Sequence, residues 1–100
     1  MPAAYPAADT ASIEPLLTLM SELPKGDPAR QAELFQSAKD AAALSPTTSN
    51  RLRYALALAT PGHGGSDPVA AQRQLSELLA RPETLLTVER LLALVELQEV

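Results

Sequence analysis

Two Asp-Pro pairs divide the chain into short helical segments. Aspartate accepts hydrogen bonds from the free N–H groups that open a helix, and proline fits the first helical position because no N–H is needed there. Ser45-Pro46 likewise combines a capping side chain with a proline and is predicted to start a helix. Pro24-Lys25-Gly26 and Arg81-Pro82 are predicted to interrupt helices. The pairs themselves are Asp27-Pro28 and Asp67-Pro68. With apolar residues at helical spacing between them, these signals predict five helices, over 13–22, 28–43, 48–59, 68–80 and 83–98.

The residues within these segments favour helix over strand. Alanine and leucine contribute 18 residues each, whereas valine and isoleucine together contribute 5. Alanine and leucine lose little entropy in a helix, and the β-branched strand formers are scarce. A chain of 100 residues suffices for one small domain and is too short for two. We therefore expect an all-α fold in one domain over 12–100, after a disordered leader of alanine and proline over 1–11.

The helical segments show an internal repeat. Asp27-Pro28 and Asp67-Pro68 lie 40 residues apart, and each opens a helix that is followed by a break and a second helix. The second helices also align, RLRYALAL at 51–58 with RLLALVEL at 90–97. Paired helices at this period are typical of helical solenoids. The pattern predicts two TPR-like helix-turn-helix repeats preceded by a short helix; the alternative is an irregular five-helix bundle.

The stretch from Asn50-Arg51-Leu52-Arg53 to Pro61-Gly62 also resembles a known family. It is similar to the soluble part of QseG-type proteobacterial outer-membrane lipoproteins, and the similarity extends over about residues 28–97. The resemblance implies a TPR-like domain on the periplasmic side of the outer membrane, with a sensor histidine kinase as a partner. The chain shows neither a signal peptide nor a lipidated cysteine. The periplasmic location therefore follows for a domain excised from a longer protein, and a cytoplasmic one for a full-length chain.

Several function classes are disfavoured by composition. A net charge of -4 and only three aromatic residues argue against nucleic-acid binding. No apolar run approaches the roughly 20 residues that span a bilayer, so we expect no membrane contact by this chain itself. The chain has no cysteine and one histidine, which argues against a metal site. We expect no cofactor and no enzymatic activity, with His63 a solvated residue in a flexible glycine loop.

Three arginines and a tyrosine are candidate polar contacts for a partner. Arg51 and Arg53 flank a leucine of the helix over 48–59, and Arg90 takes the position of Arg51 in the second repeat. Together the arginines would form a basic spot able to receive an acidic peptide or a carboxyl terminus. Tyr54, on a flanking stripe of the same helix, is the fourth candidate. The alternative is that these arginines pair with neighbouring glutamates or lie over leucine side chains.

The helix over 83–98 carries more apolar side chains than one buried stripe requires. One set, at helical spacing, is expected to pack against the helix over 68–80. A second set extends the apolar surface beyond that face and is expected to be exposed. The first set is Leu85, Val88, Leu92 and Val95; the second is Leu86, Leu91, Leu94 and Leu97. Exposed leucines favour association, either with a partner's amphipathic helix or in a homodimer through this helix.

The sequence therefore predicts a non-enzymatic protein–protein interaction scaffold. Its candidate partner-binding residues are the four polar side chains and the second leucine set. The resemblance makes it the soluble domain of a bacterial envelope lipoprotein that works with a sensor kinase. The alternatives are a structural oligomerisation domain and a regulatory fragment of a larger enzyme.

Overall fold

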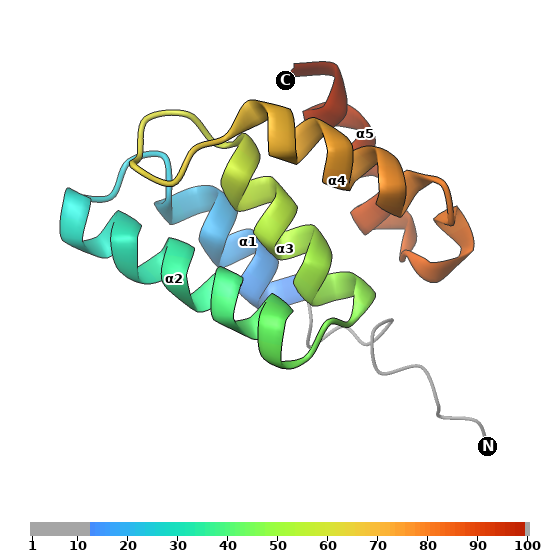
Figure 1. The fold of residues 1–100 in the computed structure, drawn as a ribbon, viewed down its shortest axis with the longest axis horizontal. Helices are drawn as coiled ribbons and strands as arrows, with labels where there is room; N and C mark the ends of the chain where they lie inside the picture. The colour runs from blue at the N-terminus through green and yellow to red at the C-terminus, as the bar shows by residue number, and fades with distance from the viewer. Residues whose placement is uncertain (1–12, 100) are drawn as a thin grey trace.

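A computed structural model of the chain describes residues 13–99. The predicted leader over 1–11 lies outside the described residues. Within 13–99 the fold is all-α, with five α-helices, one 3₁₀-helix and no strand, and the predicted fold class is confirmed (Figure 1). The elements are α1 (Ile13–Glu22), α2 (Pro28–Leu44), α3 (Thr48–Ala59), α4 (Pro68–Leu79), η3 (Pro82–Thr84) and α5 (Thr87–Glu99).

The Asp-Pro pairs start helices as predicted. The side chain of Asp27 accepts a hydrogen bond of 2.8 Å from the backbone N–H of Arg30 at the start of α2. Asp67 accepts one of 3.1 Å from Ala70 at the start of α4. The interpretation of Ser45 as the next cap is wrong, because Ser45 ends α2 and Thr47 caps α3 instead. The hydroxyl oxygen of Thr47 accepts a hydrogen bond of 3.1 Å from the backbone N–H of Asn50, so α3 begins directly after Thr47.

Helix α5 begins four residues later than the sequence predicts. Residues 82–84 form the 3₁₀-helix η3, and the Thr84 hydroxyl donates to the Arg81 carbonyl at 2.8 Å. The first α-helical residue is Thr87. The backbone N–H of Leu86, directly before α5, donates to the carboxylate of Glu89 at 2.9 Å. This contact is half of a capping box, and it fixes the start of α5 because the carboxylate satisfies an N–H that has no helical partner.

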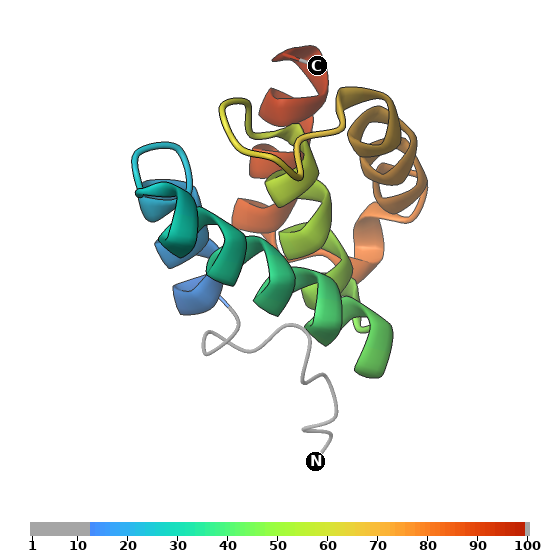
Figure 2. The same cartoon turned by 60° about the vertical axis from the view of Figure 1, so that its left-hand side comes forward.

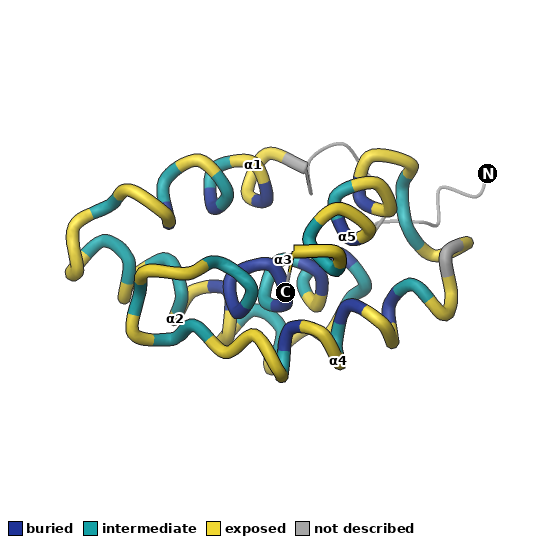
Figure 3. The backbone as a smooth tube through the Cα atoms, turned by 90° about the horizontal axis from the view of Figure 1, so that it is seen from above, coloured by how far each residue is buried: buried dark blue, intermediate teal, exposed yellow. Residues whose placement is uncertain are grey.

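Helix α3 is the centre of the molecule. It contacts α1, α2, α4 and α5, and in Figures 1 and 2 it runs between α1 and α2 on one side and α4 and α5 on the other. Figure 3 shows its backbone as the most continuously buried segment. Leu52, Ala55 and Leu56 share one face of α3 and are buried, but so are Ala57 and Leu58, while Ala59 is half-buried. A helix covered by four others buries more than one stripe.

The remaining helices each contribute a few side chains to one core around α3. Buried alanines at 38, 71 and 93, one on each of α2, α4 and α5, allow close approach of the helix backbones. The buried core residues are Leu16, Leu19, Leu23, Ala38, Leu52, Ala55, Leu56, Ala57, Leu75, Leu78 and Ala93.

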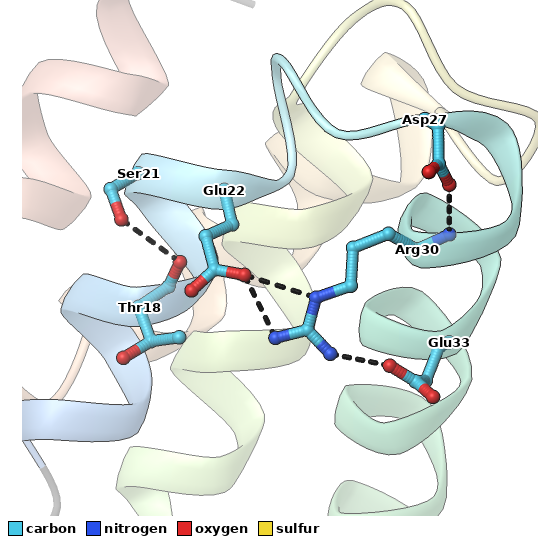
Figure 4. Close-up of polar contacts among 6 residues, drawn as sticks. All are labelled: Thr18, Ser21, Glu22, Asp27, Arg30 and Glu33. Carbon is cyan, nitrogen blue, oxygen red and sulfur yellow. Dashed lines mark hydrogen bonds and ion pairs between the residues drawn. The ribbon is translucent and has the colours of Figure 1, made fainter.

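Arg30 ties α1 to α2 across their tight connection (Figure 4). Its Nε and Nη2 atoms donate to one Glu22 oxygen at 3.0 and 2.8 Å, and its Nη1 atom donates to Glu33. The Glu22 hydrogen bond, followed by that of Glu33, raises the pKa of the Arg30 guanidinium. Such half-exposed pairs contribute little to stability.

The glycine loop is packed, and the prediction of a solvated His63 is wrong. The ring of His63 lies 5.4 Å from that of Phe35, centre to centre. Its Nε2 atom lies 2.8 Å from the carbonyl oxygen of Ala57, and its Nδ1 atom accepts from the N–H of Gly65 at 3.1 Å. An Nδ1 that accepts leaves the proton on Nε2, which therefore donates to Ala57. The histidine closes the loop over the end of α3.

We expect Gly65→Ala to destabilise the protein by about 1–2 kcal/mol. A Cβ atom at this position would lie 2.7 Å from the ring of Phe35, so the ring would have to leave its contacts with His63 and Tyr54. Urea denaturation followed by circular dichroism measures the change. Gly64→Ala is the matched control, because a Cβ there meets no atom within 4 Å. Equal stability of the two variants would contradict the packing of Gly65 on Phe35.

Candidate protein-interaction surfaces

The three candidate arginines lie on separate parts of the surface. Arg51 and Arg53 are two residues apart on α3, so their side chains leave the helix about 160° apart. Arg53 donates to the Ser37 carbonyl at 3.1 Å and lines a hollow beside α1. Arg51 lies with Tyr54 in a cleft bordered by α2 and α4, and Arg90 is exposed on α5. The prediction that the arginines form one basic spot is therefore wrong.

Arg51 and Tyr54 instead share their cleft with two other cations, Lys39 of α2 and Arg73 of α4. Glu77 of α4 is the carboxylate at this cleft, and its Oε1 lies 3.6 Å from Nη2 of Arg51. Residues 39, 51, 54, 73, 74 and 77, with an apolar side made by Ala42, Ala43 and Pro46, are called the basic cleft below. Sequence reasoning missed Lys39 and Arg73, because only the packing of α2 and α4 on α3 brings them to Arg51.

A second surface is the outer side of α5. Val88, Leu91, Leu94 and Val95 are exposed there, Leu91 by 56% of its surface. Their spacing of three and four residues places them together on one side of the helix. The opposite side carries Glu89 and Ala93, which are buried. These four exposed residues are called the α5 apolar face below.

The division of α5 into packed and exposed sets is partly as predicted. Leu85 and Leu92 pack against the core, and Leu91 and Leu94 are exposed. Val88 and Val95 were expected to be covered, but they are 42% and 51% exposed. Leu97 was expected to be exposed, but it packs against the core, and Leu86 is half-buried. The helix is rotated relative to the prediction because the buried Glu89 faces α3.

The α5 apolar face adjoins a shallow groove against α1. The groove is lined by Leu92 of α5 and by five residues of α1, namely Glu14, Leu17, Thr18, Met20 and Ser21. Leu17 is half-exposed. In Figure 3, α1 and α5 lie along one side of α3, and α4 lies along the opposite side. Leu92 is four residues after Val88 and three before Val95, so the α1–α5 groove and the α5 apolar face are continuous.

The border of this apolar surface is acidic. Glu96 and Glu99 follow Leu92 by four and seven residues, which places them on the groove side of α5. Partial burial, followed by repulsion from Glu99, raises the pKa of Glu96. Glu14 adds a third carboxylate from α1. The surface is therefore apolar in the middle and negatively charged at its edge.

A buried carboxylate links α5 to α3 by a hydrogen bond. Glu89 has no exposed surface, and its Oε2 accepts a hydrogen bond of 2.6 Å from the hydroxyl of Ser49 on α3. Its other oxygen accepts the Leu86 N–H. Glu89 therefore lies in the core and not on a polar helix face. The sequence signal for a capping role of Glu89 is its position three residues after the N-cap Leu86. This position can be recognised only once α5 is known to begin at Thr87.

The described residues hold no group of three or more histidine, cysteine, aspartate or glutamate side chains that could bind a metal ion. None of the helices within 13–99 is long and apolar enough to cross a membrane. The comparisons with known proteins found no match among family models, curated proteins or solved structures.

Proposed function

We propose that this chain is a non-enzymatic protein-interaction domain that receives an amphipathic helix of a partner protein. The observation that carries the proposal is the exposure of four apolar side chains on one side of α5, continuous with the α1–α5 groove. Apolar surface gathered in this way is characteristic of interaction sites. A groove between two helices also matches the shape of a third helix that presents residues at spacings of three, four and seven.

The charge around the groove selects the partner. Glu14, Glu96 and Glu99 border the apolar surface, so a helix with lysine or arginine beside its apolar stripe is complementary. A second copy of this chain is less suitable, because it would bring the same carboxylates to the same border and carries a net charge of -4. A homodimer through α5 is accordingly the second candidate, favoured by the same exposed leucines.

The repeat architecture and cellular setting belong to the same proposal. The Asp-Pro starts of α2 and α4, and the packing of each of α2, α3 and α4 on the helix that follows it, support two TPR-like hairpins. The similarity of residues 50–62 to QseG-type lipoproteins supports a periplasmic domain at the outer membrane, with a sensor histidine kinase as the protein that supplies the helix.

A designed lysine–leucine amphipathic peptide tests the proposal. We expect it to bind saturably and to shift the amide NMR signals of α1 and α5. Leu91→Glu combined with Leu94→Glu should weaken binding at least tenfold, because each half-exposed leucine gains roughly 1 kcal/mol on full burial. Both side chains point outward, so the double variant should unfold at the same urea concentration as the parent protein.

Leu44→Glu is the matched control, since Leu44 is exposed at the end of α2, away from the groove. It should bind the peptide as the parent protein does. Equal weakening by the control, or shifts outside α1 and α5, would contradict the proposal. Light scattering separates the second candidate: a concentration-dependent doubling of mass that Leu94→Glu removes would assign the surface to a second copy of the chain.

A further inference from the structure

The basic cleft concentrates positive charge on an acidic protein. Lys39, Arg51 and Arg73 supply three of the eight basic residues of the chain, each from a different helix, whereas Glu77 supplies one of the 12 acidic residues. All three cations are exposed. Packing of α2 and α4 on α3 thus gathers cations that are 12 and 22 residues apart along the chain. The local charge is positive, opposite in sign to that of the whole chain.

Two of these cations make no ion pair within the described part of the chain. Arg51 lies 3.6 Å from Glu77, which is a loose contact between half-exposed groups. Lys39 and Arg73 have no carboxylate within ion-pair distance among residues 13–99. Arg30 shows the contrast, since it binds two carboxylates between α1 and α2. The charge of Lys39 and Arg73 is therefore available to an anionic ligand.

The uncharged residues of the cleft indicate which other groups a ligand should carry. Ala42, Ala43 and Pro46 form an apolar side, and the half-buried Tyr54 also lines the cleft. The cleft has a volume of about 430 Å³, open to solvent, which suits a few residues of an extended segment rather than a buried small molecule. We propose that the basic cleft binds an acidic peptide segment, with carboxylates on Lys39, Arg51 and Arg73 and a small apolar side chain against Ala42, Ala43 and Pro46.

A protein ligand fits this cleft better than a nucleic acid. Single-stranded nucleic acid is held by stacking of successive bases on several aromatic rings, and Tyr54 is the aromatic side chain at the cleft. A net charge of -4 also repels a polyanion at long range, whereas a short acidic segment meets mainly the local field. The site lies on α2, α3 and α4, apart from the α5 apolar face. Its failure would leave the function proposed above untouched.

The probe is a short fluorescein-labelled peptide with glutamates around a central alanine. We expect saturable binding to the full chain with a Kd below about 1 mM at low ionic strength. The same peptide with glutamine in place of glutamate should bind at least tenfold more weakly. Lys39→Glu combined with Arg73→Glu should weaken binding at least tenfold, while Lys25→Glu combined with Arg81→Glu, the same change of charge at exposed positions outside the cleft, should change it less than twofold.

Glu77→Gln should strengthen binding by about two- to fivefold, because it removes the carboxylate that competes for Arg51. Glu83→Gln, at an exposed position outside the cleft, is its control and should leave the affinity almost unchanged. A gain of affinity cannot arise from misfolding. Equal binding of the glutamine peptide, equal effects of the paired variants, or tighter binding of a single-stranded oligonucleotide at this cleft would overturn the proposal.

Discussion

Leu56→Ala is expected to lower the free energy of unfolding by about 3–4 kcal/mol, a large share of the stability of a domain this small. Leu56 is 1% exposed on the helix that contacts the four others, and it belongs to the core cluster. Truncation removes the transfer free energy of three carbon atoms. It also leaves a cavity that α3 cannot close without moving away from another helix.

Leu44→Ala is the matched control, because it removes the same three carbon atoms from an exposed position. Leu44 is 85% exposed at the end of α2, so the same truncation there should change stability by less than about 0.5 kcal/mol. Urea denaturation of both variants, monitored by circular dichroism, gives the two values. A cost below about 1 kcal/mol for Leu56→Ala would mean that the core around α3 tolerates rearrangement and is not close-packed.

The helices themselves were predictable because their signals are local. Asp27 and Asp67 cap helices through hydrogen bonds to residues three positions later, and such contacts depend on neighbouring sequence alone. The scarcity of β-branched residues fixed the all-α class in the same way. The start of α5 was missed because the feature that sets it, the Glu89 contact with Leu86, also depends on burial against α3.

The surfaces were harder to predict because they depend on which helix covers which. Helical spacing predicted Leu91 and Leu94 as exposed correctly, but Val88 and Val95 are exposed against expectation, and Leu97 packs against the core. The prediction that the three candidate arginines form one basic spot failed for a related reason. Positions that match in a sequence repeat need not meet in space, and Arg51 and Arg53 leave α3 on different sides. Lys39 and Arg73 lie near Arg51 because of tertiary packing, which cannot be predicted from local sequence patterns.

Both candidate surfaces depend on how helices are placed around α3. The basic cleft needs α2 and α4 in place, and the α1–α5 groove needs α5 held against the core by its buried side. Core alanines at 38, 71 and 93 allow close approach but specify orientation weakly, because a small side chain fits more than one rotation. The two hydrogen bonds that Glu89 accepts are directional, so they restrict the rotation of α5 more than a small apolar side chain does. We therefore assign the rotation of α5, and with it the exposure of its apolar face, to the Glu89 contacts.

Glu89→Ala is expected to destabilise the protein by about 3 kcal/mol and to loosen α5 more than α2. The change removes the acceptors of the Ser49 hydroxyl and of the Leu86 N–H at a fully buried position, and each loss costs about 1–3 kcal/mol. Glu89→Gln should cost less, because its amide oxygen can still accept from Leu86 while its NH₂ group donates to Ser49.

Urea denaturation gives the total cost, and amide hydrogen exchange locates it. In Glu89→Ala, amides of α5 should exchange faster relative to those of α2, since α5 loses both its N-terminal cap and its link to α3. Glu83→Ala is the matched control, because Glu83 is exposed on η3 and its removal should change stability by less than about 0.5 kcal/mol. If Glu89→Ala and Glu83→Ala prove equally stable, or if exchange rises evenly over all helices, the buried carboxylate does not position α5, and the orientation of its apolar face must come from packing alone.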